Sequence, residues 1–154
     1  MADLRVCFED LGLENVSTVQ QTGNVVFSAA ASPAAMKRMI ESALVQRFDY
    51  PVQVQIYRMA QLRQIVAETP FADTEADMHS YVVFCEHGAE RSLAGEATDL
   101  DSAVEKIVAG EGVLYWRVPK GSTLDSAFAK HLARAKYRNL HTSRNINTLR
   151  KIVD

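Results

Sequence analysis

Near the end of the chain, one arginine lies among residues of the kind that cap helices, in the stretch TSRNINTLRKI from Thr142 to Ile152. The side-chain oxygen of Ser143 or Asn145 can accept hydrogen bonds from the first amides of a helix. Arg144 has no part in such a cap. Because a helix N-terminus presents free N–H groups and a dipole that favours negative charge, an arginine beside it predicts a site for a phosphate or a carboxylate.

Two interpretations of this stretch stay open. In the first, Arg144, Asn145 and Asn147 bind an anion, whereas in the second the whole motif serves helix capping. A second polar element, the turn QTGN, offers Gln21 and Asn24 as another wall of a shared pocket. Turn chemistry alone is the alternative there, because glycine and asparagine tolerate the backbone angles of a tight hairpin.

The C-terminal part of the chain is basic. No acidic residue occurs from Ser126 to Val153, although the whole protein has 19 acids against 17 lysines and arginines. Besides Arg144, the cations of this tract are Lys130, Arg134, Lys136, Arg138, Arg150 and Lys151. Such a face predicts weak, salt-sensitive binding to nucleic acid or another polyanion. The alternative is a solvated face that pairs with the acidic remainder of the chain.

Several chemistries are not predicted. The four histidines show no metal-ligand spacing, neither cysteine lies in a CxxC motif, and no P-loop, GxGxxG or GxSxG occurs. We therefore expect no metal and no cofactor, and we expect Cys7 and Cys85 to be buried thiols. The N-terminus does not resemble a signal peptide, and no window approaches 18 apolar residues, so a cytoplasmic protein without membrane contact is expected.

These observations favour a non-enzymatic protein that binds an anionic ligand or a protein partner. The competing hypothesis is an enzyme that acts on a phosphorylated or carboxylated small molecule, with Arg144 as a clamp for the charged group. An enzyme would need a pocket with converging polar groups, whereas a binding protein needs only a basic face.

The elements that position these residues follow from hydrophobic periodicity and turn signals. In the first half we expect a helix over 4–11, a hairpin of strands 16–21 and 25–28, a capped helix over 33–48, a strand over 51–57 and a helix over 59–69. In the second half we expect a strand over 81–86, a short helix within 91–100, a hairpin around 110–112, a helix over 124–138 and a last helix from about 145.

Hairpins in both halves force antiparallel pairing, so the fold class is α+β. Tyr115 and Trp116 are consecutive in the second strand of the later hairpin. They must point to opposite faces of a sheet, so one of them lies on the outer face. That aromatic either is exposed and stacks a base beside the basic helix or, as we favour, packs under a neighbouring loop.

Two motifs in this order, FEDLGLENVSTVQQTGNVVF at Phe8 to Phe27 and HTSRNINTLRKI at His141 to Ile152, resemble the DUF1697 family of unknown function. The resemblance implies a ferredoxin-like α/β sandwich over residues 1–70 and a linker over 71–80. A smaller α/β C-terminal subdomain with a basic helical tail follows over 81–154.

Members of that family typically begin with a strand and a Gly-rich loop, whereas this chain begins at the helix that follows them. In a βαββαβ sandwich the first strand is central, so its absence leaves neighbouring strands unpaired. Two explanations stay open: the start of this sequence is misplaced, or another strand fills the slot, as in a homodimer formed through the unpaired sheet edge by strand addition or swapping.

Overall fold

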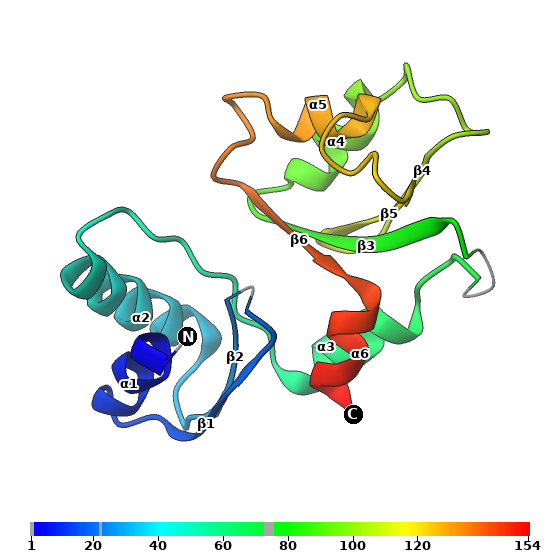
Figure 1. Ribbon diagram of the computed structural model, residues 1–154. Coiled ribbons are helices and arrows are strands. Elements are labelled where there is room, and N and C mark those ends of the chain that lie inside the picture. Colours follow the sequence, from blue (N-terminus) through cyan, green and yellow to red (C-terminus); the bar gives the residue numbers. More distant parts are fainter. Residues whose placement is uncertain (1, 22, 73–75) are drawn as a thin grey trace. The chain divides into compact units, whose positions relative to one another are not determined.

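The computed structural model describes residues 2–21, 23–72 and 76–154 (Figure 1). The chain forms two compact units: unit 1 comprises residues 1–64 and 148–154, and unit 2 comprises residues 65–147. The predicted linker over 71–80 is in part a strand, because β3 begins at Met78, and residues 73–75 lie outside the described residues. Within the described residues, no helix is both long and apolar enough to cross a membrane.

Unit 1 contains α1 (Ala2–Asp10), β1 (Glu14–Val19), β2 (Asn24–Ser28) and α2 (Pro33–Phe48), and shares α3 (Met59–Ala67) with unit 2. The predicted hairpin is present, since β1 and β2 pair antiparallel. The predicted start of α2 is also confirmed: Ser32 is the N-cap and its hydroxyl accepts the N–H of Ala35 at 3.2 Å. The apolar core of this unit consists of Cys7, Phe8, Leu13, Val16, Met36, Ile40 and Leu44.

The prediction of a strand over 51–57 is wrong. The segment packs Val52, Val54 and Ile56 partly into the core of unit 1, as the alternation indicates, but no strand is assigned there. The backbone of Val54 is bound by side chains of α2 instead. Its N–H donates to Glu41 Oε1 at 2.9 Å, and its carbonyl accepts from Lys37 Nζ at 2.5 Å. Alternation therefore predicts burial here, but a strand also needs a neighbour to pair with.

Unit 2 is built on a four-stranded antiparallel sheet of order β4-β5-β3-β6. Its elements are β3 (Met78–Cys85), α4 (Ala89–Glu96), β4 (Lys106–Ala109), β5 (Val113–Pro119), α5 (Ala127–Leu132) and β6 (His141–Asn145), and α6 (Ile146–Val153) begins in this unit and continues in unit 1. The α+β class and the hairpin between β4 and β5 are confirmed. The helix expected over 124–138 is shorter, and β6 was not predicted at all.

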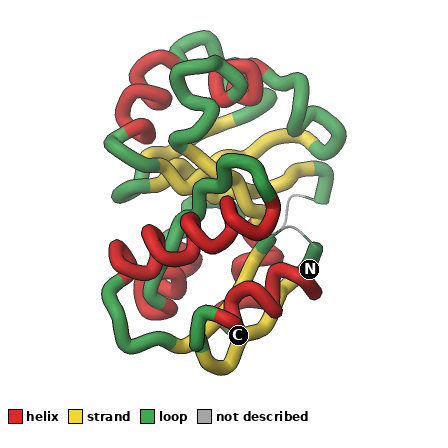
Figure 2. Tube along the Cα trace, turned by 90° about the vertical axis from the view of Figure 1, so that its left-hand side faces the viewer, coloured by secondary structure: helices red, strands yellow, loops and turns green. Residues whose placement is uncertain are grey.

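Helices α4 and α5 both cover one face of this sheet (Figures 1 and 2). The buried residues of this layer are Val83, Cys85, Ala89, Leu93, Leu114, Trp116, Val118, Phe128, Leu132 and Tyr137. Tyr115 points to the other face, yet it is as buried as Trp116, so neither aromatic is exposed, and the favoured alternative of packing against a neighbouring segment describes Tyr115. The reason is that the other face is covered in part as well: the Tyr115 hydroxyl donates to the carbonyl of Ile65 at 2.7 Å.

Candidate functional site: the basic face of the unit 2 sheet

Three cations share the sheet face that α4 and α5 leave uncovered. Arg144 on β6 is directly opposite Val82 on β3, which in turn is opposite Tyr115 on β5. Arg117, two residues beyond Tyr115, is opposite Lys106 on β4. Directly opposed residues of an antiparallel pair, and residues two apart along one strand, project to the same side. We call this side of the sheet the basic sheet face.

No acidic residue belongs to the strands on this face. By register its positions are Met78, Ser80, Val82, Phe84, Lys106, Val108, Val113, Tyr115, Arg117, Pro119, Thr142 and Arg144. The guanidinium of Arg117 lies over the ring of Phe71, with its carbon 5.5 Å from the ring centroid. The strands of this face therefore carry cations alone, and part of their charge stacks on an aromatic ring from the segment that precedes β3. A carboxylate from outside the sheet lies near the same face, because Glu68 contributes, after burial, to the raised pKa of Tyr115.

Arg144 is half-buried on the edge strand β6. Its Nη1 donates to Thr142 Oγ1 at 2.7 Å and to the carbonyl of Ser143 at 2.9 Å. Burial lowers the pKa of the guanidinium, because the charged form loses solvation, although an arginine stays protonated. Two hydrogen bonds to its own strand thus orient a charge that the protein has partly removed from water.

Asn145 performs the capping role that the sequence offered as an alternative. Its Oδ1 accepts the N–H of Asn147 at 2.9 Å at the start of α6, and its Nδ2 donates to His79 Nδ1 at 3.4 Å. Because side chains alternate along a strand, Asn145 and Arg144 project to opposite faces of the sheet. The structure therefore separates the side chains of Arg144 and Asn145, which the sequence analysis had placed in one site.

The predicted second wall of the pocket lies in the other unit. Asn24 begins β2 and its Nδ2 donates to the carbonyl of Val19 at 3.0 Å, which supports the hairpin interpretation. Gln21 is exposed, and its neighbour Thr22 lies outside the described residues. Since both belong to unit 1 and Arg144 belongs to unit 2, a pocket shared by them stays a prediction.

The cations of the basic tract are divided between the two units. Lys130, Arg134, Lys136 and Arg138 belong to unit 2, whereas Arg150 and Lys151 belong to the part of α6 in unit 1. One carboxylate, that of Glu96, pairs with both Arg134, at 3.4 Å, and Lys136. The hydrogen bond from Lys136 is the main cause that lowers the pKa of Glu96. Pairing with an acidic residue is thus observed for Arg134 and Lys136.

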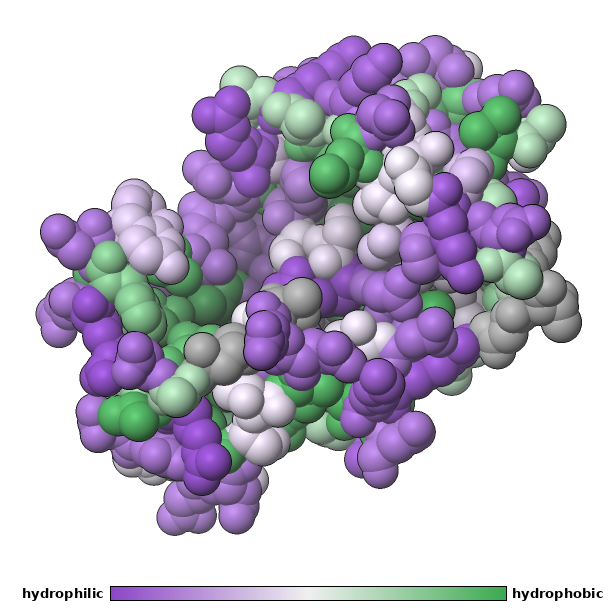
Figure 3. Space-filling model, in the orientation of Figure 1, coloured by the Kyte–Doolittle hydropathy of each residue, from purple (hydrophilic) through white to green (hydrophobic). Residues whose placement is uncertain are grey.

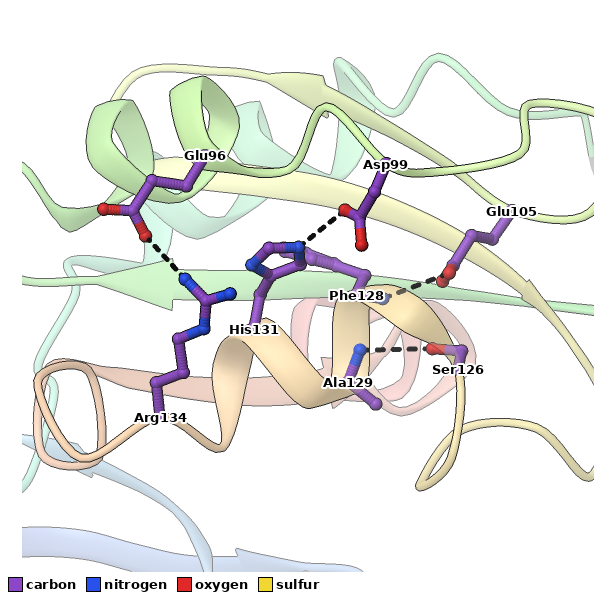
Figure 4. Close-up of polar contacts among 8 residues, drawn as sticks. All are labelled: Glu96, Asp99, Glu105, Ser126, Phe128, Ala129, His131 and Arg134. Atoms are coloured by element: carbon purple, nitrogen blue, oxygen red, sulfur yellow. Dashed lines mark hydrogen bonds and ion pairs between the residues drawn. The ribbon is translucent and has the colours of Figure 1, made fainter.

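A histidine–aspartate pair, which sequence reasoning missed, joins α5 to the loop after α4 (Figure 4). The ring of His131 is buried, and its Nε2 lies 2.7 Å from Oδ1 of the exposed Asp99. The hydrogen bond from His131 is the main cause that lowers the pKa of Asp99. The nearby hydroxyl of Ser126 accepts the N–H of Ala129 at 3.1 Å as the cap of α5. The pair therefore holds α5 against the loop after α4, and the hydroxyl of Ser126 serves as the N-cap of α5.

Glu105 is a buried carboxylate with both oxygens in use. Oε1 accepts the N–H of Phe128 at 3.1 Å, and Oε2 accepts Trp116 Nε1–H at 2.9 Å. It thereby joins β5 to the first turn of α5, and Figure 4 shows its bond to Phe128. No sequence pattern marks it, because a glutamate directly before a strand is ordinary; only the approach of Trp116 and Phe128 gives it this role.

The thiols and possible metal ligands show no reactive arrangement. Cys7 and Cys85 are free and buried, as predicted. Burial, with a smaller contribution from Glu90, raises the pKa of the Cys85 thiol to about 12, so this thiol stays protonated and weakly nucleophilic at neutral pH. In the described part of the chain, no group of three or more histidine, cysteine or acidic side chains is arranged to hold a metal ion.

Comparisons with known proteins identify the family. No curated protein matches the chain. A solved structure, described as that of conserved bacterial protein SP0830 from Streptococcus pneumoniae, is similar with a TM-score of 0.79. It is 22% identical over 99% of this chain and 86% of the other, which shows a shared fold. The family model described as protein of unknown function (DUF1697) matches residues 1–115, more than half of the chain. The chain therefore belongs to the DUF1697 family.

Proposed function

We propose that this protein is a non-catalytic binding protein whose ligand is anionic and binds on the basic sheet face at Arg144. The observation that carries the proposal is the half-buried guanidinium of Arg144 on a sheet face whose strands contain no acidic residue. A planar guanidinium fits a carboxylate or phosphate with two parallel hydrogen bonds.

The surroundings of Arg144 support this proposal. The bonds of its Nη1 to Thr142 Oγ1 and Ser143 O limit the conformations of the side chain, so less entropy is lost when an anion binds. Arg117 and Lys106 on the same face add positive potential. Arg144 on β6 and Arg117 on β5 are separated by two strand spacings across the sheet, each about 4.8 Å, and by two residues along the strand.

Among the described residues, we find no acidic, basic and nucleophilic side chains that face one common position for a substrate, which favours a binding protein over an enzyme. The described histidine–carboxylate pair, His131 and Asp99, fastens α5, and the hydroxyl of Ser126 is bound to the helix that it caps. Acid–base and nucleophilic catalysis need such groups to face a common position for a substrate. An enzyme that uses Arg144 as a clamp for the charged group would need catalytic residues other than His131, Asp99 and Ser126.

Weak binding of nucleic acid through the basic tract is a second candidate, and it is less well supported. Arg134 and Lys136 already pair with Glu96, so displacing that carboxylate opposes contact with phosphates. Each phosphate contact should change the slope of log K against log salt by about −0.9 for duplex DNA. A measurement of this slope separates the basic tract from a small-anion site.

The experiment is a titration of the full chain with inorganic phosphate, a small phosphate monoester and citrate, followed by calorimetry and by the NMR shifts of amides 142–147. Arg144→Ala should weaken binding about tenfold or more, because hydrogen bonds to charged groups contribute about 1.5–3 kcal/mol. Arg144→Lys should fall short of the native affinity, since lysine lacks the planar fork.

Arg138→Ala is the matched control, because Arg138 is an exposed arginine of the same unit that lies outside the sheet. It should leave the affinity unchanged. Equal losses from Arg138→Ala and Arg144→Ala would point to a diffuse basic surface, and a failure of all three anions to bind would overturn the proposal. Thermal melts of each variant show whether the fold is retained.

A further inference from the structure

The sheet of unit 1 has only two strands, β1 and β2, and in the described part of the chain β2 pairs with β1 alone. A two-stranded hairpin is marginally stable without further strands or helices against it. An unpaired strand edge also presents N–H and C=O groups that can pair with another chain. We propose that β2 pairs antiparallel with β2 of a second copy, which gives a two-fold dimer with a continuous sheet of four strands.

The two free edges of this sheet differ in how well they are protected. On β1 the register shifts between Glu14 and Ser17, and Asn15 has a positive φ of 53°, so the strand is bulged and carries a charge. Bulges and charges are the usual devices that block pairing at an edge. The edge of β2 has neither, because its sequence NVVFS contains no charged residue and no proline and its register with β1 is regular from Val25 to Val26.

The sequence of β2 is complementary to itself in an antiparallel pair. With the two-fold axis at Val26, Asn24 is opposite Ser28 of the second copy, Val25 is opposite Phe27, and Val26 is opposite itself. Val25 and Phe27 both project toward the apolar core of unit 1, where the rings of Phe27 and Phe8 meet edge to face at 5.5 Å between centroids. The dimer would therefore pair apolar with apolar and polar with polar residues, and it would bring no like charges together.

The apolar side chains of β2 are incompletely covered by unit 1 itself. Val25, Val26 and Phe27 are all half-buried, unlike the central strands of unit 2. Further apolar surface of unit 1 lies on α2, where Val45 is 42% exposed, and Figure 3 shows hydrophobic residues (green) among hydrophilic ones over this region. A second copy against β2 would cover apolar side chains that the monomer leaves accessible, which favours association.

The experiment measures the oligomeric state of the full chain by sedimentation velocity over a wide range of protein concentration. The dimer fraction should rise with concentration. Val26→Lys places two like charges directly opposite each other on the two-fold axis and should raise the dissociation constant at least tenfold, and Val26→Glu should do the same. An equal mixture of the two variants should recover a heterodimer, because opposite charges then face each other.

Ser17→Lys is the matched control, since Ser17 is the register partner of Val26 on β1 and places the same charge on the same face, one strand away. It should leave the dimer intact. A chain that stays monomeric at every concentration overturns the proposal. So does a dimer that Val26→Lys does not weaken, because its interface would then lie elsewhere.

Hydrogen exchange of the unaltered chain keeps the proposal testable if the Val26 variants do not fold. Those β2 amides that point away from β1 should become more protected as protein concentration rises, and no change in their protection would contradict pairing at this edge. This inference concerns unit 1 and does not rest on anion binding at Arg144.

Discussion

The extended segments of the two units form their backbone hydrogen bonds with different partners. In unit 2, β3 pairs along its length with β5 on one side and with β6 on the other. Among the described residues of unit 1, β2 pairs with β1 alone, and the extended segment that follows α2 has the side chains of Lys37 and Glu41 bound to the backbone of Val54. Backbone hydrogen bonds between strands form whatever side chains the strands carry, so the sheet of unit 2 can carry charges on one face. The extended segment of unit 1 instead depends on the side chains of Lys37 and Glu41.

The largest expected effect is at Glu105, a side chain that unit 2 uses to join β5 to α5. Glu105→Ala leaves the buried donors Trp116 Nε1–H and Phe128 N–H without their acceptor. Each unsatisfied donor costs about 1–3 kcal/mol, so we expect a loss of about 2–4 kcal/mol in the free energy of unfolding, measured with urea. Glu105→Gln should cost less, because its single carbonyl oxygen still accepts one bond. A loss as small as that of a surface substitution would show that Glu105 does not join β5 to α5.

A smaller effect is expected from Glu41→Ala in unit 1. The N–H of Val54 then loses its carboxylate acceptor, but the site is only half-buried, so water replaces part of the bond. We expect a loss of about 1 kcal/mol and faster hydrogen exchange of the Val54 amide. Arg38→Ala, an exposed position on the same helix, is the control. If the Val54 amide exchanges no faster in Glu41→Ala, the extended segment has another source of order and the contrast between the two units weakens.

The smallest expected effect is a pH dependence from Asp99. The hydrogen bond from His131 lowers the pKa of this carboxyl in the folded state, so its stabilisation is present above the ordinary aspartate pKa of about 3.9 and is lost as pH falls through the folded-state value. Thermal melts at successively lower pH should show the native protein losing stability below about pH 4 more steeply than Asp99→Asn. Identical slopes for the two proteins would mean that the pair does not fasten α5 in solution.

The family assignment and much of the local structure were predictable from the sequence. Ser32 and Pro33 mark the start of α2, the Gly-containing turns mark both hairpins, and these signals are local because they reflect the backbone angles of a few adjacent residues. The buried state of Cys7 and Cys85 also follows from their apolar surroundings in sequence. The α+β class is a consequence of the hairpins, since a short connection permits only antiparallel pairing.

Only the tertiary structure decided which extended segments become strands and which side chains share a face. The segment 51–57 alternates ideally but is not a strand, whereas the polar stretch His141 to Asn145 is one, because β3 offers it an open edge. That pairing also turns Arg144 and Asn145 to opposite faces, although they are neighbours in sequence. Hydrophobic period is a property of the segment itself, but a strand is defined by its partner, and the partner is brought in by residues distant along the chain.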